Sequence, residues 1–259
     1  MKTALVTGAG ARLGRAMALY LGARGYDVAV HYNTSSEGAD EVVAALEAMG
    51  QRGVAVQADL LNEDETQSLF SRAVTALGAP ITCLVNNASI FEYDNVTTAT
   101  AESWDRHIGS NLRAPFILTQ AMAKQGLAPL TDENGEPKAS GLIVNMLDQK
   151  VRKLNPEFMT YTIAKMGLWA MTQTTAQALA PAIRVNAIGP GPTLQGAHQT
   201  AETFAKQRAR VLLARGANPE DITAALGYFL DAPSVTGQLL CADGGEHLAW
   251  KTQDVHGFE

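Results

Sequence analysis

Short runs of consecutive apolar residues alternate along the chain with longer stretches in which apolar residues recur every three or four positions. A short continuous apolar run is typical of a strand buried on both faces, whereas the wider spacing, as in Leu69, Ala73, Ala76 and Leu77, indicates an amphipathic helix. The predicted strands are 3–7, 27–32, 54–58, 81–86, 142–146, 183–188 and 238–242. Between the first six of them, the predicted helices are 12–23, 38–49, 63–77, 102–125 and 159–180.

Strands that alternate with helices in this way predict an α/β fold, with a doubly wound, seven-stranded parallel sheet covered by helices on both faces. No linker rich in Pro, Gly or Ser divides the chain, so residues 1–259 are predicted to form a single domain. The polar stretch 130–140, with an Asn134-Gly135 turn signal, is expected to be a surface loop. Residues 190–218 follow the carboxyl end of a strand, where ligands bind in open α/β sheets, and are a candidate substrate lid.

The composition narrows the function classes. The chain has 259 residues, 46% of them hydrophobic and 18% charged, as expected for a protein that folds without the support of disulfide bonds or structural metal ions. Its net charge of −6 argues against general binding to nucleic acid or to an anionic membrane. Cys83 and Cys241 lack metal-site spacing and are expected to be buried thiols. No apolar run is long enough to span a membrane and no signal-peptide layout is present, so the prediction is a cytoplasmic protein that acts on a small-molecule substrate.

The first predicted strand runs into a glycine-rich turn that opens a helix. Gly8 and Gly14 let the backbone turn tightly and approach a pyrophosphate, while the helix start at Arg12 and Leu13 offers N–H groups and a positive dipole. A glycine-rich turn by itself is also found in ordinary strand-to-helix connections. Its position after the first strand of a βαβ unit favours binding of a dinucleotide.

The end of the second predicted strand points to the kind of dinucleotide. NAD-binding proteins usually place a carboxylate there for the adenosine ribose, but this chain has His31, Asn33, Thr34 and Ser35 in that stretch and no acid. Hydroxyl groups, an amide and the guanidinium of Arg12 suit a 2′-phosphate. The predicted cofactor is therefore NADPH. In the alternative interpretation, Arg12 merely solvates the start of the helix.

A tyrosine and a lysine stand one turn apart on a predicted helix. Tyr161 and Lys165 therefore share one face, about 6 Å apart. A nearby ammonium favours phenolate over phenol, so Lys165 is expected to lower the pKa of Tyr161 toward the working pH and make it a proton donor. Taken alone, this motif would more often be a surface pair of Tyr and Lys.

Together, these features resemble the short-chain dehydrogenase/reductase family along nearly the whole chain, and this resemblance implies a Rossmann-type fold. It also implies that Tyr161 transfers the proton, that Lys165 holds the nicotinamide ribose and that Asn111 supports a proton relay. Most members of this family are homotetramers or homodimers. Further cofactor contacts implied by the resemblance are Asp59, Leu60, Asn87, Ala88, Ser89, Pro190, Gly191 and Thr193.

Two departures make the chain similar to the pteridine reductase branch of that family. Arg12 replaces the third glycine of the turn, and Asp148 stands where the family has its catalytic serine. In that branch, an aromatic residue at the position of Phe91 stacks on the pterin. The resemblance thus implies that Phe91, Asp148 and Tyr161 contact a pterin substrate.

The chemistry of Asp148 agrees with a pterin substrate. A carboxylate would repel the negative charge that develops on a ketone oxygen, whereas reduction of a C=N bond leaves a nitrogen that needs a proton. Which of Asp148 and Tyr161 donates each proton stays open. The alternatives are a carbonyl reductase acting on a ketone or a 3-oxoacyl substrate, in which Asp148 has drifted, and a sensor that binds NADPH without turnover. Phe91 could equally be a loop hydrophobe without a ligand role.

Several conspicuous side chains are interpreted as structural. His107, His198, His247 and His256 have no metal-ligand spacing and are expected to be surface or packing residues. Trp104 and Trp169, both on predicted helices, are expected to be core or subunit-interface residues.

Overall fold

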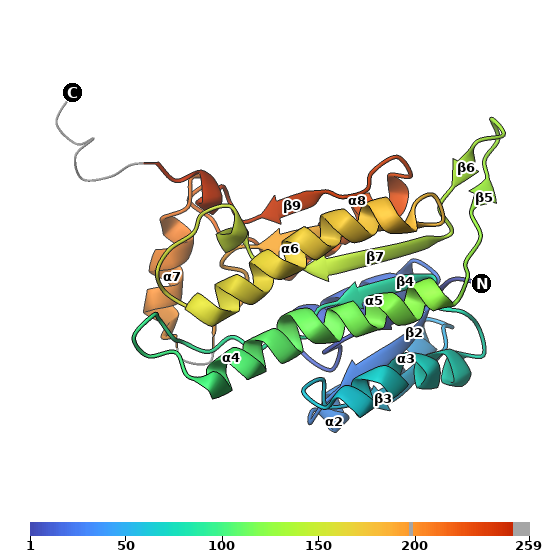
Figure 1. The fold of residues 1–259 in the computed structure, drawn as a ribbon, viewed down its shortest axis with the longest axis horizontal. Coiled ribbons are helices and arrows are strands. Elements are labelled where there is room, and N and C mark those ends of the chain that lie inside the picture. The colour runs from blue at the N-terminus through green and yellow to red at the C-terminus, as the bar shows by residue number, and fades with distance from the viewer. Residues whose placement is uncertain (197–198, 251–259) are drawn as a thin grey trace.

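Seven parallel strands form the central sheet in a computed structural model of the chain, which describes residues 1–196 and 199–250 (Figure 1). They are β1 (Thr3–Val6), β2 (Asp27–Tyr32), β3 (Gly53–Gln57), β4 (Cys83–Asn86), β7 (Gly141–Met146), β8 (Ile183–Pro190) and β9 (Leu239–Ala242). Their order in the sheet is β3-β2-β1-β4-β7-β8-β9, with every neighbouring pair parallel. The predicted doubly wound fold is confirmed.

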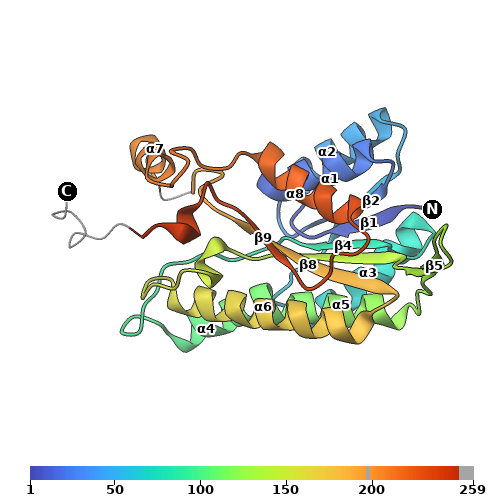
Figure 2. The same cartoon turned by 90° about the horizontal axis from the view of Figure 1, so that it is seen from above.

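Helices cover both faces of this sheet (Figure 2). One face carries α1 (Arg12–Ala23), α2 (Ser36–Ala48) and α8 (Pro219–Asp231), and the other carries α3 (Glu63–Leu77), α4 (Ala101–Ile108), α5 (Ala114–Lys124) and α6 (Met159–Leu179). Side chains such as Met17, Leu46 and Phe229 fill the first layer, and Leu69 and Met122 the second. Each fully buried side chain of this size contributes about 1.5–3 kcal/mol, so the two layers stabilise the packing of the helices on the sheet.

The predicted helix 102–125 is interrupted in the structure. Its middle forms a π-helical turn, η1 (Gly109–Arg113), which separates α4 from α5. The extra residue per turn brings Asn111 inward, where its side chain bonds the backbone of Ile90. The apolar periodicity continues across such a turn, which is why the sequence predicted a single helix.

Two further segments differ from the prediction. The stretch 130–140, expected to be a loop, is a small antiparallel hairpin of β5 (Leu130–Thr131) and β6 (Pro137–Lys138), which turns at Gly135 with a φ of +81°. The lid candidate 190–218, of which 197–198 lie outside the described residues, contains a helix, α7 (Ala201–Ala209). Helix α8, absent from the prediction, begins after Asn218, whose backbone N–H donates to Asp221 Oδ2 at 2.7 Å.

Within residues 1–196 and 199–250, no helix meets the length and apolarity that a membrane span requires. The same part of the chain has no cluster of three or more His, Cys, Asp or Glu side chains placed to bind a metal ion. Cys83 is buried as expected, and burial raises its thiol pKa to about 12, whereas Cys241 is only partly buried.

Candidate active site

The predicted site residues come together at the carboxyl edge of the sheet. The glycine turn follows β1, residues 87–91 follow β4, Asp148 follows β7 and the lid candidate follows β8. Because the strands are parallel, these connections share the edge of the sheet that faces α7 (Figure 1).

The glycine turn is tied directly to the end of β4. The Thr7 hydroxyl accepts hydrogen bonds from Asn87 N at 2.8 Å and Ala88 N at 3.0 Å, and Asn87 Nδ2 donates to Thr7 O at 2.8 Å. A Cβ on Gly14 would lie 2.1 Å from Gly8 O, so only glycine allows this approach of helix and turn. Helix α1 begins without a side-chain cap and without an acidic residue in its first turn. Its first N–H groups are therefore suited to a pyrophosphate.

His31 supports this turn from inside the protein. Its Nδ1 accepts from Gly8 N at 2.9 Å, and its Nε2 donates to Ala58 O at 3.0 Å. Burial lowers the pKa of His31 to about 4, which keeps the imidazole neutral and able to accept. The sequence predicted a cofactor contact here. The structure buries the ring behind the turn, where it contacts Gly8 of the predicted phosphate-binding turn.

The residues predicted to surround the adenosine lie at the ends of β2 and β3. Asn33, Thr34 and Ser35 are exposed, and Leu60 is buried. The carboxylate of Asp59 accepts from Leu61 N at 3.0 Å and from Asn33 Nδ2 at 3.4 Å. Hydroxyl and amide groups, with no acid directly after β2, thus face the solvent at this end of the site.

Arg12 adopts a positive φ of +52° at the start of α1. Its guanidinium donates to Gln195 O at 3.0 Å and to Leu194 O at 3.3 Å, so it contacts the lid candidate. These acceptors are neutral carbonyls, and a phosphate would be a stronger acceptor for the same group. A contact with the 2′-phosphate stays a prediction.

The chemical centre is a phenol bonded to a carboxylate. Tyr161 OH donates to Asp148 Oδ2 at 2.9 Å, and Asp148 Oδ1 accepts from Lys150 N at 2.8 Å. One turn further along α6, Lys165 Nζ donates to Met146 O at 2.8 Å and lies 5.6 Å from the centre of the Tyr161 ring. Both Tyr161 and Lys165 are almost fully buried.

Burial sets the protonation of these three groups. It raises the pKa of Asp148, and together with the Asp148 carboxyl it raises the pKa of Tyr161 well above 10. It lowers the pKa of Lys165 to about 8. The expectation that Lys165 brings the pKa of Tyr161 toward neutrality is therefore wrong for this arrangement, because burial and the Asp148 carboxyl both favour the neutral phenol. The pair forms a hydrogen-bonded acid whose carboxyl can hold a proton at higher pH than usual.

Asn111 and Phe91 are linked through one residue. Asn111 Oδ1 accepts from Ile90 N, and its Nδ2 donates to Ile90 O, both at 2.8 Å. The side chain predicted to support a proton relay therefore fixes the backbone next to Phe91. The Phe91 ring lies 4.7 Å from that of Tyr161, edge to face, and Phe91 is 52% exposed. Asn111 thus positions an accessible aromatic ring beside the phenol.

Comparison with known proteins identifies the family of this chain. A family model described as short chain dehydrogenase matches residues 2–208. The chain belongs to the short-chain dehydrogenase/reductase family. Two relatives illustrate its range. The 3-oxoacyl-[acyl-carrier-protein] reductase of Synechocystis is 34% identical, covering 94% of this chain and 96% of that protein. The crystal structure of FolM alternative dihydrofolate reductase 1 from Brucella suis, in complex with NADP, has a TM-score of 0.89 and 40% identity, covering 98% of each chain.

A third similar structure is that of angucycline C-6 ketoreductase LanV with bound NADP. It has a TM-score of 0.84 and 31% identity and covers 96% of each chain. As a short-chain dehydrogenase/reductase, this protein is an oxidoreductase that uses a nicotinamide cofactor, and the uncapped start of α1 and the close contact of Gly14 with Gly8 fit the pyrophosphate of such a dinucleotide.

In this short-chain dehydrogenase/reductase, a single arginine holds much of the lid candidate, and the sequence carried no signal for it. The Arg208 guanidinium donates to Pro192 O at 2.8 Å, Gly216 O at 3.1 Å and Asn218 Oδ1 at 2.9 Å. Thr193, predicted to contact the cofactor, is buried and donates to Gly191 O at 3.0 Å. Arg208 thus ties the beginning of the lid candidate, at Pro192, to its end, at Gly216 and Asn218.

The remaining conspicuous side chains have structural contacts. His107 is buried and its Nδ1 lies 2.7 Å from Thr160 Oγ1, and His247 pairs with Asp243 at 2.7 Å. Trp104 is 44% exposed on α4, and Trp169 lies under the Arg152 guanidinium. His198 and His256 lie outside the described residues.

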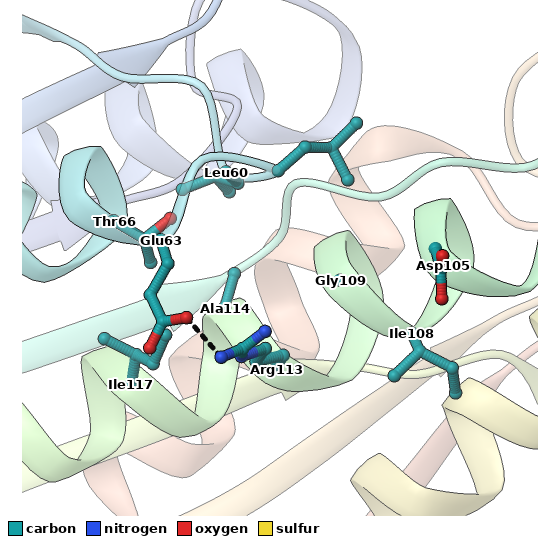
Figure 3. A pocket seen from close by; sticks show the side chains of 10 residues that line it. Leu60, Glu63, Thr66, Asp105, Ile108, Gly109, Arg113, Ala114 and Ile117 are labelled. Atoms are coloured by element: carbon teal, nitrogen blue, oxygen red, sulfur yellow. Dashed lines mark hydrogen bonds and ion pairs between the residues drawn. The ribbon is translucent and has the colours of Figure 1, made fainter. Parts of the chain in front are cut away.

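A surface pocket of about 340 Å³ lies beside the loop that follows β3 (Figure 3), and its lining includes neither Tyr161 nor Asp148. Its wall includes Leu60, Asp105 and the ion pair of Glu63 with Arg113. Leu60 is the one lining residue that the sequence assigned to the cofactor. The pocket therefore adjoins the predicted adenine end and not the chemical centre.

Proposed function

We propose that this protein is an NADPH-dependent reductase of a pterin, such as dihydromonapterin, dihydrobiopterin or dihydrofolate. The observation that carries the proposal is the 2.9 Å bond between Tyr161 OH and the Asp148 carboxylate, beside the exposed ring of Phe91. The likeness to the Brucella FolM alternative dihydrofolate reductase, at 40% identity over almost the whole chain, supports it.

The chemistry of the pair fits a C=N substrate. Bound NADPH would supply the hydride to the carbon of the C=N bond, and the reduced nitrogen would then need a proton. The raised pKa of Asp148, caused by burial, lets its carboxyl carry that proton, and Tyr161 OH is bonded to it. Phe91 stacks on the flat ring, as aromatic pairs prefer offset or edge contacts at 4.5–7 Å. Lys165 holds the nicotinamide ribose in this proposal.

Turnover of a substrate panel tests the proposal. Loss of NADPH absorbance is expected with dihydromonapterin, dihydrobiopterin or dihydrofolate, and not with aliphatic ketones or 3-oxoacyl thioesters. Turnover of the ketones alone would favour the other reading, a carbonyl reductase, to which the Synechocystis 3-oxoacyl reductase and the ketoreductase LanV lend support. Tight NADPH binding without any turnover would leave the sensor reading, against which the buried Tyr161 and Lys165 argue.

The proposed preference for NADPH over NADH rests on the polar, acid-free end of β2 and on Arg12. Replacing Arg12 by alanine is expected to raise the NADPH KM and to lower the NADPH-to-NADH preference about tenfold, the loss expected for a hydrogen bond to a charged group. The matched control is Arg15→Ala, because Arg15 lies on the same helix and pairs with Glu41. Equal losses with both cofactors would assign Arg12 to the pyrophosphate or to the lid carbonyls instead.

We also propose that the enzyme is a cytoplasmic homotetramer or homodimer. Exposed apolar side chains on the helices of one face support a subunit contact there: Trp104 on α4, Phe116 on α5 and Ile163 on α6 are 44%, 45% and 39% exposed. Light scattering of the purified protein measures the state directly.

A further inference from the structure

Phe91 is stacked on a second aromatic ring that the sequence did not single out. The centres of the Phe91 and Phe158 rings are 4.4 Å apart, and their planes differ by 10°. Phe91 as a whole is 52% exposed with Phe158 in place, so the stack leaves about half of the residue open to solvent. Phe91 lies in the segment 87–100, which contains neither helix nor strand. Its ring therefore depends on side-chain contacts for its orientation.

Phe158 is held by its backbone, in a conformation that bulky residues rarely adopt. Its φ is +56°, directly before the first residue of α6. Asp94 fixes the residues that follow: Asp94 O accepts from Met159 N at 3.3 Å, Asp94 Oδ1 accepts from Thr160 N at 3.1 Å, and Asp94 Oδ2 accepts from the Thr160 hydroxyl. Burial opposes ionisation of Asp94, but the hydrogen bonds from Thr160 and Ser103 outweigh it, and the pKa of Asp94 is lowered. The carboxylate thus stays ionised and keeps these bonds.

The ring of Phe158 is fixed from two further sides. Lys150 Nζ lies 5.2 Å from its centre, and the ring of Tyr93 meets it edge to face at 5.3 Å. Lys150 also donates its backbone N–H to Asp148. The stack is therefore connected to Asp148 through Lys150 and to Tyr161 through α6. A left-handed residue held by several contacts at a site is a sign of preorganisation.

We propose that Phe158 is a positioning residue that holds the Phe91 ring ready to stack on a flat bicyclic heteroaromatic substrate. This inference rests on the proposed function and adds a specificity determinant to it. Fixing a side chain before binding removes the entropy that its ordering would otherwise cost. The Phe91–Phe158 stack thereby favours substrates with a flat ring over aliphatic carbonyl compounds, which gain nothing from a preset aromatic surface.

Steady-state kinetics of Phe158→Ala test the proposal. The KM for the dihydropterin is expected to rise about three- to tenfold, the range for an aromatic pair, with kcat and the NADPH KM within about twofold of wild type. Phe158→Tyr keeps the ring and should restore the KM. Phe158→Gly removes the ring while favouring the positive φ, and should match Phe158→Ala. The matched control, Tyr93→Ala, removes a ring that touches Phe158, and should have a smaller effect.

Three outcomes would overturn the role of Phe158: an unchanged dihydropterin KM in Phe158→Ala, an equal rise in its NADPH KM, or failure of Phe158→Tyr to restore the dihydropterin KM. Calorimetry of biopterin binding to the NADP⁺ complex gives a readout without turnover. The biopterin Kd of Phe158→Ala is expected to rise about three- to tenfold, as the KM does.

Failure of the proposed function gives a different result. In that case wild type neither binds biopterin nor reduces any dihydropterin, and a flat aromatic ketone such as 1-tetralone is compared with aliphatic ethyl acetoacetate. Phe158→Ala should then raise the KM of the aromatic ketone only. Equal effects on both ketones, or none on either, would overturn the role of Phe158 itself.

Discussion

Replacing Asp148 by asparagine is expected to lower kcat/KM for dihydropterin reduction by about 10²–10⁴-fold, the usual contribution of a general acid. Asparagine has nearly the same shape, and its amide oxygen can still accept from Lys150 N, whereas its Nδ2 takes the place of the oxygen that accepts from Tyr161 OH and can only donate. It cannot deliver a proton at neutral pH. The measurement is the initial rate of NADPH oxidation, with the NADPH Kd from fluorescence titration as the control for an intact fold. A loss below about threefold would remove Asp148 from the proton path.

The variant Asp148→Ser distinguishes the pterin reductase hypothesis from the carbonyl reductase hypothesis. A serine hydroxyl can donate to a carbonyl oxygen as negative charge develops on it, which the carboxylate would repel. For a pterin reductase, the serine variant should lose dihydropterin turnover as the asparagine variant does. Raised ketone turnover, with no dihydropterin turnover before or after the substitution, would instead support the carbonyl reductase.

The second large effect is the pH dependence of turnover through Lys165. Because burial lowers its pKa to about 8, the free enzyme should lose kcat/KM above that pH, by about tenfold for each further pH unit. The loss follows from removing the positive charge that lies 5.6 Å from the Tyr161 ring and that binds the nicotinamide ribose in our proposal. Initial rates across this range measure it, and a flat profile through pH 8 would contradict the assignment.

The sign of the stability effect separates this loss from unfolding. Lys165 has a pKa near 8 in the folded chain and 10.5 as its ordinary value, so between these values the unfolded chain binds more protons. Its contribution to the free energy of unfolding therefore rises as the pH rises from 8 toward 10.5. Turnover and this contribution thus change in opposite directions, and circular dichroism at the same pH values provides the control. Lys165→Met, without a titrating group, should be inactive at every pH while keeping the folded spectrum.

The fold was predictable because its determinants are local and periodic. Each parallel strand is buried on both faces and therefore reads as an apolar run, and the glycine turn stands where the first run ends. The interruption at η1 was not predictable, because it goes with Asn111 bonding the backbone of Ile90, a loop residue 21 positions earlier in the chain. The hairpin at 130–140 has strands of two residues each, too short to produce an alternating pattern.

The sequence was enough to predict which residues form most of the site, but not their burial or their pKa shifts. The sequence predicted that Tyr161, Lys165 and Asp148 lie in one site. The direction in which the pKa of Tyr161 shifts, however, depends on burial and on a hydrogen bond to Asp148, which the spacing does not reveal. His31 was assigned to the surface of the cofactor site because the end of a strand does not tell which face a ring takes. Phe158 gave no signal, since a positive φ at phenylalanine is visible only in coordinates.

One hydroxyl group joins the two halves of the site. Thr7 Oγ1 accepts from Asn87 N and Ala88 N and donates to Val85 O at 3.3 Å, which uses its whole hydrogen-bonding capacity. The turn that would hold the phosphates and the segment that leads to Phe91 are therefore both attached to the same Thr7 hydroxyl. The Thr7 hydroxyl therefore limits how far the turn and the segment that leads to Phe91 can move apart.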